Sequence, residues 1–186
     1  MIELYYDSFD LACIIHSLDM GTKTASIMLE KIWKEDNQYL SPFYRTNLRQ
    51  LYLDVHYWTD YLCDKPVIDK EFPAVQKDFR SFGKDVEEAA FITDYFDIDL
   101  FFKMKRVQIL YLDGQYYVRM KLRTLLKAYG YKRRTQELLK YLRECMMFYH
   151  MQTYLRGKEE CDIGEIGLDE MITIRAVSYT HLRAHE

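Results

Sequence analysis

Hydrophobic residues recur at intervals of three and four along most of the chain, which is the spacing of one face of an α-helix. Between residues 8 and 35 this spacing predicts one or two helices, which begin at Asp7 or Ser8 and are interrupted at Gly21. Residues 85–103 are also expected to be helical, because the acidic residues near their start suit the positive end of a helix dipole. The N-terminal part of the chain is therefore predicted to be helical.

The strongest helical pattern extends from Pro42 to about Cys63. Ser41 is a favourable N-cap, and a proline at the first helical position costs no hydrogen bond. Asp64-Lys65-Pro66 is expected to end the helix. The apolar positions form a narrow stripe, called the apolar seam below, at Tyr44, Leu48, Leu51, Val55, Trp58 and Leu62. A stripe of this width is suited to packing against another helix within a bundle.

After Arg106 the hydrophobic period shortens. Residues 107–112 and 115–120 are two short apolar runs on either side of Asp113-Gly114, a dipeptide that favours the positive φ angles of a tight hairpin turn. The sequence therefore predicts a β-hairpin with one shared face, on which Val107, Ile109 and Tyr111 lie opposite Met120, Val118 and Tyr116.

Two helices and two strands are predicted beyond the hairpin. The first helix, from about Leu122, ends at Gly130, and Thr135 caps a longer second helix after the turn at residues 131–134. Residues 152–155 and 171–175 have strand patterns and flank an acidic loop. The expected fold is mainly α with a small β component (α+β): a helical N-terminal part, then a part with a hairpin and two C-terminal strands.

Composition excludes several classes of protein. The chain of 186 residues is 49% hydrophobic, with only 7 Gly and 3 Pro, which excludes a disordered or collagen-like chain. No stretch reaches 18 uninterrupted apolar residues, and the N-terminus lacks the pattern of a secretory signal. The four cysteines are dispersed. We therefore expect a cytoplasmic protein with reduced thiols and no membrane partner.

The net charge of −3 conceals blocks of opposite sign. Residues 1–99 carry 10 Lys or Arg against 19 Asp or Glu, whereas residues 100–143 carry 12 against 2. Residues 144–175 are again acidic, with 3 against 7. The sign change predicts an acidic helical region over 1–100 and a basic region over 101–175, with the helix at 85–103 belonging to either. The basic block either attracts a polyanion or is neutralised internally by the acidic part.

The order of predicted elements from Gln115 is strand, helix, tight turn, longer helix, strand, loop and strand. With the preceding acidic helix, residues 85–175 resemble a winged-helix module, a variant of helix-turn-helix. The turn Gly130-Tyr131-Lys132-Arg133-Arg134 also resembles turns in bacterial proteins of mobile elements or defence systems. The resemblance implies non-enzymatic binding of double-stranded DNA, as the sensor or regulatory part of a longer bacterial protein.

In such a module the second helix enters the major groove of DNA. The resemblance then implies base-edge contacts from Arg133, Arg134 and Gln136, since Arg pairs with guanine and Gln with adenine. It implies phosphate contacts from Lys121, Lys127, Lys132, Lys140 and Arg143. These contacts require Arg133, Arg134 and Lys140 to be exposed together with Lys121 or Lys127.

The expected wing is acidic, with Glu159, Glu160, Asp162 and Glu165, and such a wing does not suit a position beside phosphates. Two alternatives therefore stand beside DNA binding. One is a protein–protein interaction module of a helical scaffold, with the apolar seam of residues 42–63 and the acidic wing as its surfaces. The other is the non-catalytic N-terminal part of a truncated enzyme.

No catalytic, cofactor-binding or metal-binding motif is present. The chain lacks the glycine-rich phosphate loops, the H-E-x-x-H zinc motif and the G-x-S-x-G nucleophile motif. Cys13 and His16 share a helix face, but no second pair of ligands accompanies them. We therefore expect no catalytic residue, no cofactor and no metal ion.

The last ten residues, 177–186, resemble one reading frame of a transposase-type sequencing adapter. All ten residues match the translation of that adapter, and the codon for Ala176 is compatible with the bases before it. The natural sequence is therefore expected to end, within this chain, near Arg175, and residues 176–186 are set aside from the interpretation of the fold.

Overall fold

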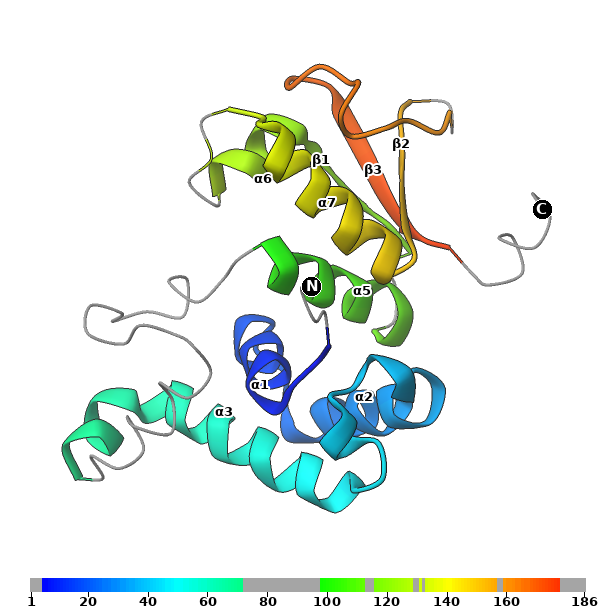
Figure 1. The fold of residues 1–186 in the computed structure, drawn as a ribbon. Coiled ribbons are helices and arrows are strands. Elements are labelled where there is room, and N and C mark those ends of the chain that lie inside the picture. Colours follow the sequence, from blue (N-terminus) through cyan, green and yellow to red (C-terminus); the bar gives the residue numbers. More distant parts are fainter. Residues whose placement is uncertain are drawn as a thin grey trace. The chain divides into compact units, whose positions relative to one another are not determined.

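The computed structural model describes residues 5–71, 98–112, 116–128, 131, 133–156 and 159–177, and only the backbone of residues 64–71 and 128. The chain divides into two compact units, residues 1–96 and 97–186. The first unit is helical in its described part, and the second combines helices with a small antiparallel sheet (Figure 1). The expected α+β class, with the strands in the C-terminal half, is confirmed.

The first unit begins with the two helices that the spacing predicts. Helix α1 spans Ser8–Ser17, and the side chains and backbone N–H groups of Asp7 and Asp10 form a reciprocal capping box at its start. Helix α2 spans Thr22–Glu35 and begins directly after Gly21. The helix break at Gly21 is therefore confirmed.

The predicted boundaries of the helix at 42–63 are wrong at both ends. Pro42–Tyr44 forms a separate 3₁₀ turn, as does Asn37–Tyr39, and helix α3 spans Leu48–Glu71. The Asn47 side chain, rather than Ser41, caps α3 by accepting the Gln50 amide at 3.1 Å. Helix α3 also continues past Pro66, since a proline removes only one hydrogen bond of the ladder and need not end the helix.

The apolar seam packs inside the first unit. Helix α3 has its most extensive contacts with α1, and Leu51, Val55 and Trp58 are almost completely buried. The Trp58 ring meets the Phe9 ring of α1 edge to face, with centroids 5.6 Å apart. The middle of the seam is therefore covered by the chain's own helix α1, whereas Leu48 and Leu62 at its ends are partly exposed.

The second unit contains three helices and three strands in its described part. Helix α5 spans Ile98–Tyr111, α6 Leu122–Ala128 and α7 Gln136–Phe148. Strand β1 spans Val118–Lys121, β2 Met151–Tyr154 and β3 Met171–Ala176. The sheet has the order β1-β3-β2, so the last strand in sequence lies in the middle (Figure 1). The two predicted C-terminal strands are confirmed.

The predicted hairpin over residues 107–120 is wrong. Residues 107–111 form the last turns of α5, where Val107, Ile109 and Tyr111 are buried, and β1 pairs instead with β3, Val118 opposite Ile174. A short apolar run is compatible with the residue spacing of a helix or of a strand. Here residues 107–111 continue the preceding helix and are therefore helical. Asp113-Gly114 lies outside the described residues.

One face of the sheet forms the core of this unit. The buried positions Val118, Ile174 and Thr153 lie in one cross-strand row, and Ile172 and Met151 extend this face. Helix α7 contributes an apolar stripe to the core, made of Leu138, Leu139, Leu142, Cys145 and Met146. The alternate sheet positions form an outer face of polar and aromatic residues.

Part of the basic block is internal to the second unit. Lys103, only 4% exposed, forms an ion pair with Asp99 at 2.6 Å. Asp99 also accepts the Tyr149 hydroxyl at 3.0 Å, and the Arg106 guanidinium donates to the Tyr149 carbonyl. This network joins α5 to the end of α7, so these two cations serve folding rather than an external anion.

None of the helices in the described part of the chain is both long enough and apolar enough to span a lipid bilayer.

Replacing Trp58 by Ala should lower the free energy of unfolding of the first unit by about 3–5 kcal/mol, the usual cost of deleting a buried large aromatic side chain. Urea unfolding followed by the fluorescence of Trp33 measures this loss. The neighbouring Tyr57, 43% exposed, is the control. Equal losses for Trp58→Ala and Tyr57→Ala would contradict the packing of the seam.

Candidate nucleic-acid interface

The described residues between α6 and α7, Tyr131 and residues 133–135, leave the start of α7 exposed. The Tyr131 amide donates to the Leu126 carbonyl at 2.9 Å, which ties the turn to α6. The Thr135 hydroxyl caps α7 by accepting the Leu138 amide at 3.2 Å. Gly130 and Lys132 lie outside the described residues. The described part of the turn leaves the positive end of the α7 dipole at the surface.

The two arginines of this turn have different environments. Arg133 is exposed and forms no hydrogen bond or ion pair with the described residues. Arg134 is half-buried, and its guanidinium donates to the backbone carbonyls of Ile163, at 3.1 Å, and Ile166. Arg133 can therefore reach an external ligand, whereas Arg134 is engaged with the loop between β2 and β3.

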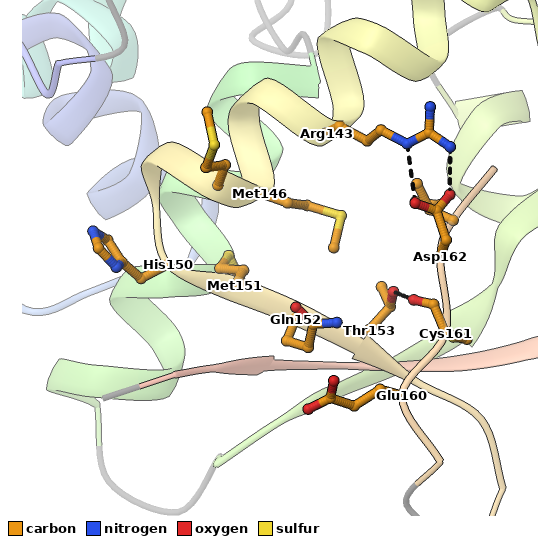
Figure 2. A pocket seen from close by; sticks show the side chains of 11 residues that line it. Arg143, Met146, His150, Met151, Gln152, Thr153, Glu160, Cys161 and Asp162 are labelled. Atoms are coloured by element: carbon orange, nitrogen blue, oxygen red, sulfur yellow. Dashed lines mark hydrogen bonds and ion pairs between the residues drawn. The ribbon is translucent and has the colours of Figure 1, made fainter. Parts of the chain in front are cut away.

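Helix α7 presents a polar stripe opposite its buried face. Gln136 and Lys140 are exposed and one turn apart. Lys140 is 3.8 Å from Glu144, a loose contact between exposed groups that leaves its ammonium accessible. Arg143, the next position of the stripe, instead binds Asp162 through two hydrogen bonds of 2.6 and 3.1 Å (Figure 2).

Arginines of α6, the turn and α7 neutralise and hold the acidic loop. Arg123 binds both carboxylate oxygens of Asp169, at 2.7 and 2.8 Å, as Arg143 binds Asp162. The hydrogen bonds from these guanidiniums lower the pKa of each carboxyl group below its ordinary value. Arg134 donates to the Ile163 and Ile166 carbonyls, so three arginines hold the loop. These contacts explain how an acidic loop can lie beside the basic helices.

Five other described cations of the basic block are available to an external anion, whereas Lys105 is half-buried and donates to Gln108 at 2.8 Å. Arg119 and Lys121 of β1, Lys127 of α6, Arg133 and Lys140 are all exposed. Of the eight residues expected to bind DNA, five therefore lie exposed without a close internal pairing: Lys121, Lys127, Arg133, Gln136 and Lys140. Arg134 and Arg143 are engaged by the loop, and Lys132 is not described.

Two cations relevant to the surface were not predicted. Arg119 falls within the predicted hairpin, and the sequence pattern predicts no role for Arg119 or Arg123. The alternation Val118-Arg119-Met120-Lys121 places Arg119 and Lys121 on one face of a strand, which was a usable signal. The pairing of Arg123 with Asp169, 46 residues away, has no local signal.

A cavity of about 520 Å³ lies between α7, β2 and the acidic loop (Figure 2). Methionines, His150 and Cys161 contribute to its lining. Burial and the nearby Asp162 and Glu159 raise the pKa of the Cys161 thiol, so its nucleophilic thiolate form is disfavoured near neutral pH. No group of three or more His, Cys, Asp or Glu residues in the described part could hold a metal ion.

Comparisons with known proteins add no assignment. No protein-family model matches the chain, and no curated protein or solved structure is significantly similar to it. The functional argument therefore rests on the geometry of the second unit.

Replacing Arg134 by Ala should destabilise the second unit by about 1–3 kcal/mol, because it removes charge-assisted hydrogen bonds from two carbonyls of the loop. Hydrogen exchange of residues 159–170 should accelerate. Arg133→Ala is a matched control with the same chemical change one residue earlier, and it should leave exchange unaltered. Equal effects of the two substitutions would contradict a positioning role for Arg134.

The pair of Arg143 and Asp162 should respond to acid. Because the folded pKa of Asp162 lies below its ordinary value of 3.8, the pair stabilises the loop fully above that pH and is lost as pH falls through the lowered pKa. The Gly164 amide, which donates to Asp162, should report this change by NMR. Asp162→Asn should abolish the transition, and a transition that persists in this variant would contradict the assignment.

Proposed function

We propose that the second unit binds double-stranded DNA as a winged-helix-like module. Its order of elements, helix, strand, helix, helix, strand and strand, supports this assignment, as does a sheet with the last strand in the middle. In this arrangement α6 and α7 are the helix-turn-helix pair, and the loop between β2 and β3 is the wing.

The observation that carries the proposal is the exposed start of α7. Arg133 and Gln136 lie there beside the positive end of the helix dipole, and neither makes a hydrogen bond to a described side chain. An arginine can bind guanine through two hydrogen bonds, and a glutamine can bind adenine in the same way. These two residues are therefore the proposed base-edge contacts.

Phosphate contacts are assigned to Lys121, Lys127 and Lys140, which are exposed, and to Lys132 from its place in the sequence. The expected roles of Arg134 and Arg143 are revised: we assign them to holding the wing, because the wing already occupies their guanidinium groups. The exposed carboxylates Glu159 and Glu165 repel phosphate. DNA therefore contacts the helices, and the wing points away from the backbone of the duplex.

The regulatory or sensory part of a longer bacterial protein is the setting that suits such a non-enzymatic module. A cytoplasmic location belongs to the same proposal, because DNA is found there and the four cysteines, all within the described residues, form no disulfide. The alternative of a partner bound through the apolar seam is not retained, since α1 covers the middle of the seam.

The full chain should bind random-sequence duplex DNA with an affinity that falls steeply as the salt concentration rises. Arg133→Ala should weaken binding roughly tenfold, within the range expected for one arginine that contacts DNA. Each of Lys121→Ala and Lys127→Ala should lower the slope of log affinity against log salt by about 0.9, the value for one phosphate contact. Fluorescence anisotropy of a labelled duplex measures both quantities.

Arg49→Ala is the matched control, because Arg49 is an exposed arginine of the first unit. It removes the same charge and should leave affinity unchanged. Absence of duplex binding at low salt, or equal losses for Arg133→Ala and Arg49→Ala, would exclude α7 as the recognition helix.

A further inference from the structure

The outer face of the sheet carries a second cationic surface that the duplex proposal does not use. The strand register places Arg119, Thr173 and Tyr154 in one row across β1, β3 and β2. In the adjacent row Arg175 lies opposite Gln152. Since directly opposed residues share a face of the sheet, these side chains lie together on the side opposite the core.

A shallow cavity of about 250 Å³ lies on this face. Arg119, Arg156 and Arg175 line it, together with Tyr117 and Tyr154, and its lining contains no Asp or Glu. Glu160 has an electrostatic effect on Tyr154 and helps to raise the pKa of its hydroxyl, after the larger effect of burial. Glu160 lies opposite Tyr154 in an isolated antiparallel bridge and is not among the residues that line this cavity. The cavity is therefore complementary to an anion.

The three arginines have no acceptor among the described residues. None of them forms a hydrogen bond or ion pair with that part of the chain, unlike Arg123, Arg134 and Arg143. The buried Nε of Arg175 is without a hydrogen-bond partner there. Its guanidinium lies over two aromatic rings, 5.9 Å from the Tyr117 centroid and 5.4 Å from that of Tyr154. A cationic cluster with no acceptor among the described residues can bind phosphate without breaking any pair described there.

The exposed tyrosine rings beside this cavity indicate which class of anionic ligand it binds. Tyr117 is 50% exposed, and the adjacent Tyr116 is 80% exposed. Surfaces that bind single-stranded nucleic acid combine exposed aromatic rings with arginines or lysines. The bases stack on the rings, and the phosphates lie along the cations. Duplex DNA cannot use such rings, because its base faces are stacked inside the helix.

We propose that the outer face of the β1-β3-β2 sheet binds single-stranded nucleic acid. Arg119, Arg156 and Arg175 contact successive phosphates, and Tyr117, with Tyr154 beside it, stacks on a base. This site is separate from the start of α7. It does not depend on duplex recognition, so each site can exist without the other.

The test measures binding of the full chain to fluorescently labelled oligo(dA) over a salt series. Tyr117→Ala should weaken binding roughly five- to a hundredfold, the range for one lost base–aromatic stack. Arg119→Gln with Arg156→Gln should lower the salt slope by about 1.4, the value for two phosphates of a single strand. The residues changed are exposed or half exposed, and circular dichroism confirms that each variant is folded.

Matched controls separate this site from the duplex site and from general attraction of anions. Tyr57→Ala removes an equally exposed tyrosine of the first unit and should have no effect. Arg133→Ala should weaken duplex binding and leave oligo(dA) binding unchanged. An abasic strand of equal length should bind more weakly than oligo(dA), by the same factor as the loss for Tyr117→Ala. Oligo(rA) should bind like oligo(dA), since the proposed contacts do not involve the 2′-hydroxyl.

Four results would overturn the proposal. The first three are absence of oligo(dA) binding at low salt, binding that the Tyr117 and double-arginine variants leave unchanged, and equal affinity for oligo(dA) and the abasic strand. The fourth is loss of oligo(dA) binding in Arg133→Ala but not in the Tyr117 and double-arginine variants, which would assign single strands to α7. Duplex binding without oligo(dA) binding would remove this site and leave the proposed function in place.

Discussion

The second unit depends on how the acidic loop between β2 and β3 is held. Asp169 binds Arg123 of α6, Asp162 binds Arg143 of α7, and two loop carbonyls accept from Arg134. Exposed ion pairs contribute little singly, but here three arginines contact one loop. Their combined effect is to fix a strongly acidic segment against a basic pair of helices.

This internal pairing divides the basic block by function. Lys103 and Arg106 are buried in the network that joins α5 to α7, and Arg123, Arg134 and Arg143 hold the loop. The cations that remain exposed lie on β1, on α6, in the turn and on α7. The two hypotheses for the block, attraction of a polyanion and internal neutralisation, therefore apply to different residues. The neutralisation seen among the described residues comes from within the same unit: from Asp99 of α5 and from the acidic loop.

Two surfaces remain after this division, and their chemistry differs. The start of α7 offers a flexible arginine and an amide side chain at a helix terminus, an arrangement suited to base edges in a groove. The outer face of the sheet offers arginines beside tyrosine rings, which suit unpaired bases.

The amino-acid sequence alone determined the helices at 8–35, the helix–turn–helix order after Leu122 and the last two strands, because each depends on local spacing, capping or turn residues. Tertiary structure decided the rest. The pattern of residues 107–111 is compatible with a strand or a helix, and these residues are helical because they continue α5. The Arg134 and Arg143 side chains appeared equivalent to Arg133 in sequence, yet their partners lie 19 or more residues away. Long-range pairing of charges has no periodic signature, so only the folded chain shows which cations remain available.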